Sequence, residues 1–292
     1  MLETPLVLAE AKTYLPGPGR CIYCWPKRHT TDRLDREHVI PKTLGGKLVL
    51  HTASCRECSG IINKEIENPT LQRMWIAPRT HLGMPTSNPK QTLPLGTWTA
   101  ETSDLPKSMD EVDFNFEQLA VEKHPFTIIF PRFAPPGILW GEQPKTTFTM
   151  TGLSAYQDPS APQPQIQHKQ SAEFQPFSPD IVCRSIAKIA HGAAVAELGM
   201  EAFSPMLPGI ILGHDQNICH LVGSTLMRGR KKQSLHEITL YVARGLVLAK
   251  VQLFARYGMQ PFLVVVGRAS IELLRWRISA LLARVRAIAR SW

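Results

Sequence analysis

The residues of this chain with the clearest capacity for chemistry are two pairs of cysteines, each pair separated by two residues. Cys21 and Cys24 form the first pair, and Cys55 and Cys58 form the second. Two such pairs can supply the four thiolates of a tetrahedral zinc site, which closes the intervening loop without a large hydrophobic core. The spacing therefore predicts a structural zinc ion and a rigid segment between the pairs.

An acidic residue and a histidine lie side by side in this segment. Glu37 and His38 are followed by an apolar stretch that reaches Gly45 and Gly46, which favour a turn. Unperturbed imidazole can accept a proton near neutral pH. The pair therefore places a potential general base next to a carboxylate, within a pattern that predicts a hairpin between Val39 and Leu50.

Taken together, these motifs resemble an HNH endonuclease in the zinc-stapled form of the ββα-metal nucleases. The resemblance is carried by Cys21-x2-Cys24, the run from Asp35 to Pro41, Gly45-Gly46, and the run from Ala53 to Cys58, and it covers about residues 18–83. It implies a hairpin followed by a helix, with a divalent cation between them and a histidine at the end of the first strand that activates water. It also implies a DNA substrate and 5′-phosphate products.

Phosphodiester hydrolysis requires both a bound cation, which a carboxylate can hold, and a general base, which a histidine can supply. The substrate is an anion that repels hydroxide, so a cation must screen it and stabilise the charge that develops on the leaving oxygen. We therefore assign His38 as general base and Glu37 as a ligand of a catalytic magnesium or manganese ion, because hard metals favour oxygen ligands.

The sequence departs from the family pattern after the last zinc cysteine. Many HNH endonucleases have Asn there, where this chain has Ser59, and a hydroxyl is a poor neutral ligand. The cation site would then recruit Asn63, which is the first choice because residues four apart on a helix share a face, or His51 on the second strand. If neither reaches a cation, the chain would be a non-catalytic zinc module that binds nucleic acid or a protein partner. The candidate phosphate contacts are Arg36, Arg73 and Arg79.

Composition is consistent with a nucleic-acid partner. The chain has 292 residues and a formal net charge of +9, and a compact basic run at 228–232 is a candidate DNA-contact loop. Only four of the six cysteines are paired by spacing, since Cys183 and Cys219 stand alone. A disulfide framework is therefore not expected, and because metal-binding thiolates need a reducing compartment, we expect a cytoplasmic location. No apolar stretch is long enough for a membrane span.

The fold class that we expect is α+β, in more than one domain with separate cores. The zinc module would occupy residues 1–83, a linker 84–111, an α+β companion domain with an antiparallel sheet 112–267, and a basic amphipathic helix 268–292. We expect Pro69 to end or kink the helix after Cys58. One long helix is predicted between Ser178 and Gly199, and we interpret its Lys188 and His191 as polar residues at the helix edge.

Overall fold

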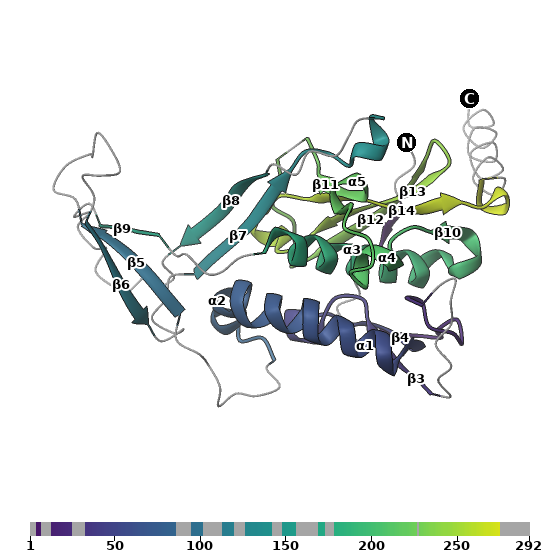
Figure 1. Cartoon of the computed structure of the whole chain (residues 1–292), viewed down its shortest axis with the longest axis horizontal. Helices are drawn as coiled ribbons and strands as arrows, with labels where there is room; N and C mark the ends of the chain where they lie inside the picture. The colour runs from purple at the N-terminus through teal and green to yellow at the C-terminus, as the bar shows by residue number, and fades with distance from the viewer. Residues whose placement is uncertain are drawn as a thin grey trace, which may run out of the picture.

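The computed structural model of the chain describes residues 4–6, 13–24, 33–85, 95–101, 113–119, 126–141, 148–155, 169–172, 178–226 and 228–274. Helix α3 (Pro179–Leu198) lies between the helical part of the N-terminal module and a large antiparallel sheet (Figure 1). It begins after Ser178 and ends at Gly199, whose φ of 78° suits glycine, as the sequence predicts. The predicted α+β class is confirmed.

The large sheet is formed mainly by strands from the C-terminal part of the chain. Its order is β1-β12-β13-β14-β10, and β11 also pairs with β14, with every neighbour antiparallel. The bounds are β1 Thr4–Leu6, β10 Phe203–Pro205, β11 Val222–Ser224, β12 Glu237–Ala243, β13 Leu246–Gln252 and β14 Phe262–Ala269. Arg244 and Gly245, both at positive φ, form the turn between β12 and β13. The first strand of the chain therefore belongs to this sheet.

Two smaller antiparallel sheets occupy the middle of the chain. One has the order β6-β5-β9 and the other is the hairpin β7-β8. Their bounds are β5 Leu95–Glu101, β6 Asp113–Leu119, β7 Phe126–Phe133, β8 Phe148–Ala155 and β9 Lys169–Ala172, and short helices follow at α4 Pro208–Ile211 and α5 Ile218–Leu221. Strand β5 lies inside the segment expected as a linker, which thus contains regular structure.

The N-terminal module is a three-stranded sheet followed by a helix. Strand β4 (Leu48–Cys55) pairs in parallel with β2 (Thr13–Leu15) and antiparallel with β3 (Leu34–His38). A hairpin is present, but the range predicted for it was wrong: its first strand ends at His38, before Val39, and a helical turn at Lys42–Leu44 precedes the glycines. A Cβ on Gly46 would lie 1.9 Å from the carbonyl oxygen of Ile40, so only glycine fits there.

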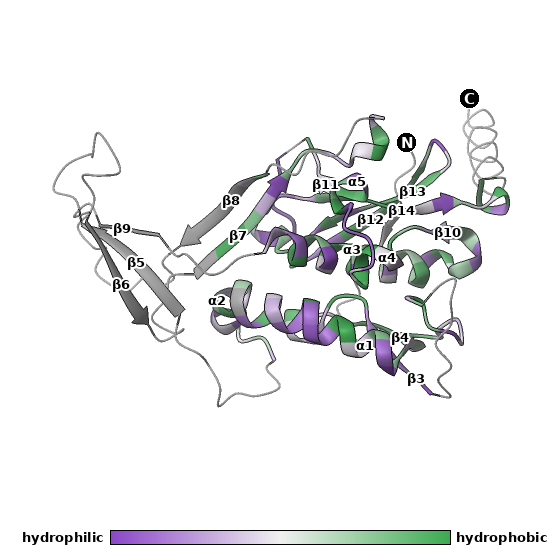
Figure 2. Ribbon diagram, viewed as in Figure 1, coloured by the Kyte–Doolittle hydropathy of each residue, from purple (hydrophilic) through white to green (hydrophobic). Residues whose placement is uncertain are grey.

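The helix after the second cysteine pair does not end at Pro69. Helix α1 (Arg56–Ile62) continues into π-helical turns at Asn63–Glu67 and Thr70–Met74, and α2 (Ile76–His81) follows. Proline has no N–H to donate to the helix. In the π-helical turns on both sides, a backbone N–H donates instead to the carbonyl five residues earlier, as Trp75 N–H does to the Thr70 carbonyl at 2.9 Å. Hydrophilic and hydrophobic residues alternate along this helix (Figure 2).

The buried side chains of the module, of α3 and of the large sheet form one continuous hydrophobic cluster. Ile22, Val39 and Trp75 from the module join Ile186 from α3 and Val264 from β14 in it, all without exposed surface. The described residues thus share one core across the predicted domain boundary, where we expected separate cores. The division of the chain into domains stays a prediction.

The ends of the chain are only partly described. Of the helix expected at 268–292, Arg268 and Ala269 still belong to β14 and residues 271–274 are helical, while 275–292 lie outside the described residues. None of the helices in the described part of the chain has the length and apolar character needed to span a bilayer.

Candidate active site

The four paired cysteines form a compact and buried group. Their sulfur atoms all lie within 4.8 Å of one another, and each side chain is buried. Tetrahedral zinc with bonds of about 2.3 Å would hold four sulfurs about 3.8 Å apart, so a small contraction completes the site. The Cys55 sulfur accepts a hydrogen bond from the Cys58 N–H at 3.5 Å. A hydrogen bond from the Cys58 thiol lowers the pKa of the Cys21 thiol to about 4. The donor set fits structural zinc.

His38 ends strand β3 and its side chain is half-buried. The strand register places Val49 of β4 opposite His38, and Tyr14 of β2 on the other side of Val49. His51 lies two residues beyond Val49, hence on the same face of the sheet, and its ring centroid is 5.1 Å from that of Tyr14. The structure therefore places the two predicted histidines on one face of the small sheet.

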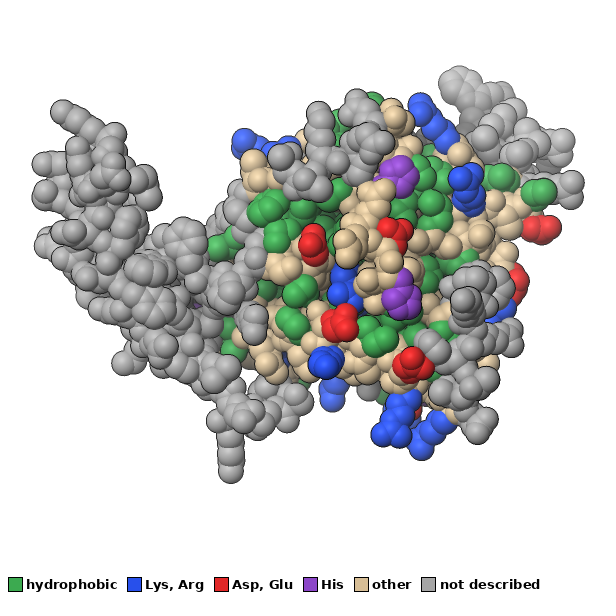
Figure 3. Space-filling model, viewed as in Figure 1, with side chains coloured by type: hydrophobic (Ala, Val, Ile, Leu, Met, Phe, Trp, Pro, Cys, Tyr) green, Lys and Arg blue, Asp and Glu red, His purple; other side chains and the backbone are tan. Residues whose placement is uncertain are grey.

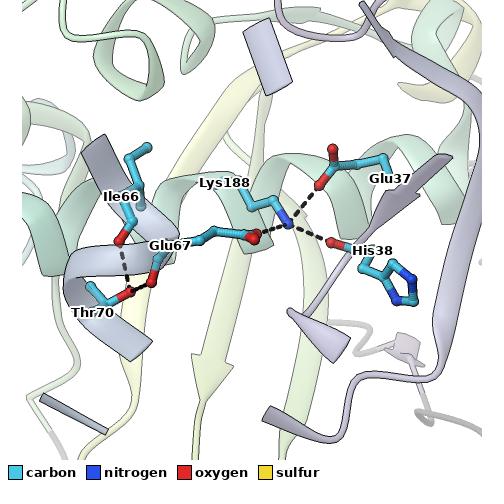
Figure 4. Close-up of polar contacts among 6 residues, drawn as sticks. All are labelled: Glu37, His38, Ile66, Glu67, Thr70 and Lys188. Carbon is cyan, nitrogen blue, oxygen red and sulfur yellow. Dashed lines mark hydrogen bonds and ion pairs between the residues drawn. The ribbon is translucent and has the colours of Figure 1, made fainter. Parts of the chain in front are cut away.

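Glu37 points to the opposite face and is buried there, with 6% of its surface exposed. One of its carboxylate oxygens lies 2.6 Å from Nζ of Lys188 on α3, and the same ammonium is 3.0 Å from a carboxylate oxygen of Glu67. Lys188 also donates a hydrogen bond to the backbone carbonyl of His38. The His38 ring points away from Lys188 (Figure 4).

Burial and charge act against each other in this cluster. Burial raises the pKa of Glu37, whereas the charge of Lys188 lowers it and does not fully offset the burial. Burial lowers the pKa of Lys188, but the charges of Glu37 and Glu67 outweigh it and leave that pKa raised. Lys188 is therefore a buried cation held by two acids, and Glu37 does not fit the role of a metal ligand in this arrangement.

Helix α3 contacts the module through three basic side chains at helical spacing. Arg184 binds Glu65 at 2.8 Å, Lys188 binds Glu37 and Glu67, and the His191 ring lies 2.8 Å from the carbonyl oxygen of Ile22. Residues at i, i+4 and i+7 lie on one face of a helix. The interpretation of Lys188 and His191 as edge residues was wrong, since both are buried, and the spacing of the three basic residues was the available signal.

The remaining candidate ligands do not gather into a second cluster. Asn63 is exposed at the start of the first π-helical turn, and the Ser59 hydroxyl donates to the carbonyl of Arg56 at 3.2 Å. Within the described ranges, the four cysteines are the one group of three or more His, Cys, Asp or Glu side chains placed to share a metal ion. Asn63 and His51 as cation ligands stay predictions.

The three candidate arginines differ in their surroundings. Arg36 is exposed on β3, and Figure 3 shows basic side chains gathered at the edge of the molecule over β3 and the start of α1. The side chain of Arg73 lies outside the described part. Arg79 is 9% exposed and donates to the carbonyls of Thr43, Leu71 and Pro85 at 2.9, 2.9 and 3.2 Å. We therefore correct the assignment of Arg79 as a phosphate contact, because its buried side chain ties the turn after β3 to α2.

The turn after His38 is also fixed by the large sheet. The His236 ring lies 2.8 Å from the Leu44 carbonyl oxygen, and a side-chain atom of Leu235 lies 4.0 Å from where a Cβ on Gly45 would be. These two residues follow the basic run at 228–232, whose arginines and lysines are exposed. The run therefore lies close in sequence to residues that contact the zinc module.

Comparison with known proteins gives one match. Residues 21–75 match the model of a family described as HNH endonuclease, which confirms the resemblance read from the motifs. The matched segment contains the four cysteines, Glu37 and His38, and it ends before α3. No curated protein and no solved structure matches the chain.

Proposed function

From the match of residues 21–75 to the HNH endonucleases, we propose that the chain is a metal-dependent DNA endonuclease in which His38 is the general base. The observation that carries this proposal is the position of His38. Its half-buried imidazole lies at the end of β3, on a segment held between two cysteine pairs, and on the sheet face opposite the buried Glu37.

The proposed reaction is hydrolysis of a phosphodiester bond. The neutral imidazole of His38 takes a proton from water as the water oxygen attacks phosphorus in line. The bond to the 3′ oxygen breaks, and the products are a 3′-hydroxyl and a 5′-phosphate. The zinc site would fix the strand that carries His38 and take no part in the chemistry.

A bound magnesium or manganese ion would screen the phosphate and stabilise the negative charge on the leaving oxygen. Glu37 is not available to hold it, because its carboxylate is buried against Lys188. Asn63, which is exposed, and His51, which shares a sheet face with His38, remain the candidate ligands. Glu37 therefore takes no part in the proposed mechanism.

Charge supports a nucleic-acid substrate. The chain carries a formal net charge of +9, and Arg36 is exposed one residue before Glu37 on the strand of His38. The exposed basic run at 228–232 precedes residues that bind the turn after His38. Phosphate contacts from such positions would orient a duplex without reading its sequence.

Two observations favour a second candidate, a zinc module that binds nucleic acid or a protein partner without cutting. The Ser59 hydroxyl is bonded to the helix backbone, and the Glu37 carboxylate is bonded to Lys188. Both positions would hold a cation in the family pattern. The retained His38, whose side chain is half-buried at the end of β3, argues for the enzyme.

The test is cleavage of supercoiled plasmid by the zinc-loaded protein. We expect nicked and then linear product with magnesium or manganese, none when EDTA has removed the divalent ion, and ends that a ligase joins without a kinase. DNA that is retarded in a gel but stays intact under every divalent ion would favour the non-catalytic module.

A further inference from the structure

We propose that Lys188 is a positioning residue for His38, and that its ammonium takes the place beside Glu37 that a divalent cation would otherwise fill. This inference rests on the proposed function of His38 as the general base. It concerns a helix outside the matched segment 21–75, since Lys188 lies 150 residues after His38.

All the hydrogen-bond donors of the Lys188 ammonium are taken up by acceptors of the N-terminal module. A lysine ammonium has three N–H donors. Lys188 has three acceptors, namely one carboxylate oxygen of Glu37 at 2.6 Å, one of Glu67 at 3.0 Å, and the carbonyl oxygen of His38. All three belong to the N-terminal module, and Lys188 is 1% exposed. No donor remains for solvent or for a substrate phosphate, so Lys188 can act only through the module.

The same three oxygens resemble a site for a hard cation. Two carboxylates and a backbone carbonyl are the ligands that magnesium and calcium prefer. Here α3 fills that site with a side chain of the protein itself, and Lys188 lies between Glu37 of β3 and Glu67 of the helix after Cys58 (Figure 4). The Glu37 charge is therefore balanced without a metal.

The bond to the His38 carbonyl links Lys188 to the imidazole. Strand β3 has an irregularity in its register between Asp35 and Glu37, just before His38 pairs with Val49. A donor on the carbonyl of His38 fixes the peptide plane, and with it the direction of the bond from Cα to Cβ. Glu67 is itself held, because its carbonyl accepts the Thr70 hydroxyl at 3.1 Å.

The experiment uses the full-length, zinc-loaded protein and three variants. Lys188→Met removes the ammonium and keeps most of the side-chain volume. A triple variant, Lys188→Met with Glu37→Gln and Glu67→Gln, also removes the two buried charges, so that it folds even if the single variant does not. Arg184→Met is the matched control, since Arg184 contacts Glu65 from the preceding turn of the same helix.

Two readouts separate positioning from a purely structural role. We expect the triple variant to melt near the wild-type temperature, yet to nick plasmid with kcat at least tenfold lower and KM within twofold. We also expect the NMR cross-peak of the His38 Cε1–H group, assigned by its loss in His38→Asn, to shift in this variant and to stay in place in Arg184→Met. A triple variant with wild-type kcat and an unmoved His38 peak would overturn the proposal.

The NMR readout does not depend on activity. If the wild-type protein cuts no substrate, the proposed nuclease function fails, and the His38 peak in the triple variant still decides whether Lys188 positions the ring. The claim about the cation is tested by Mn²⁺ binding, followed by electron paramagnetic resonance. We expect Glu37→Gln to bind Mn²⁺ within twofold of wild type, and a tenfold weaker affinity would overturn that claim.

Discussion

The ring of His191 lies 2.8 Å from the carbonyl oxygen of Ile22, and so joins helix α3 to the backbone between the first two zinc cysteines. His191 is fully buried, and burial lowers its pKa to about 4, so the neutral ring donates through Nε2 to a carbonyl that can only accept. The zinc site and the long helix therefore belong to one packed unit.

The first prediction concerns the module on its own. A fragment of residues 13–85 would expose Ile22, Val39 and Trp75, which are fully buried in the whole chain, and would lose the contacts from α3. We expect it to aggregate or to melt without cooperativity even with zinc present. Size-exclusion chromatography and thermal melts check this, and a monomeric fragment with a sharp transition would count against a shared core.

The second prediction concerns zinc. Cys55→Ser removes one of four buried thiolates, and we expect bound zinc, measured by mass spectrometry of the metal, to fall from one per chain to nearly none, with a large loss of thermal stability. Cys219→Ser is the control, because Cys219 is a half-buried cysteine outside the group of four. Equal zinc content in both variants would show that the four sulfurs do not form the site.

The third prediction compares a buried ion pair with a more exposed one. Lys188→Ala leaves the buried Glu37 without its cation, and we expect the free energy of unfolding to fall by about 3–5 kcal/mol. Glu65→Gln removes a pair whose acid is 47% exposed, and we expect a change below about 1 kcal/mol. Urea denaturation of both variants provides the measurement, and similar losses would contradict the assignment of Lys188 to the core.

The fourth prediction is a pH dependence of stability. His236 accepts the Phe254 N–H on Nδ1 and donates through Nε2 to the Leu44 carbonyl, and burial lowers its pKa to about 4 from the ordinary value of 6.5. Between these two values the unfolded chain binds more protons at this site. The contribution of His236 to the free energy of unfolding is therefore fully present above pH 6.5. It falls by about 3 kcal/mol as the pH falls towards 4.

The variant His236→Gln should lose this share of the pH dependence, which urea denaturation at several pH values would measure. His214→Gln is the control, because His214 is exposed and should leave the curve unchanged. A wild-type slope in His236→Gln would mean that the buried ring does not titrate on unfolding.

Local patterns predicted the parts of the fold that local chemistry determines. The cysteine spacing located the sulfur group, and the Ser178 and Gly199 signals located α3 almost to the residue. The partners of Arg79 are backbone carbonyls, which every residue offers, so no sequence pattern marks it as buried. The Lys188 contacts join residues far apart in the chain, and the spacing of basic residues on α3 gives no sign of which acids Lys188 meets.

The role of Pro69 shows a further limit of sequence patterns. Proline disfavours a helix because it lacks an N–H, and the rule predicts that the helix ends or kinks there. Here the helix continues because π-helical turns lie on both sides, and the Thr70 hydroxyl donates to the Ile66 carbonyl at 2.8 Å. Both π-helical turns lie against α3, and such packing is not visible in the local sequence.

The central claim is that the imidazole of His38 activates water for phosphodiester cleavage. The most direct measurement is the rate of plasmid nicking under identical divalent ion conditions by wild type, His38→Ala and the exposed control His214→Ala, all with equal zinc content. We predict a rate at least about 100-fold lower for His38→Ala and an unchanged rate for His214→Ala. Equal nicking by His38→Ala and wild type would contradict the claim.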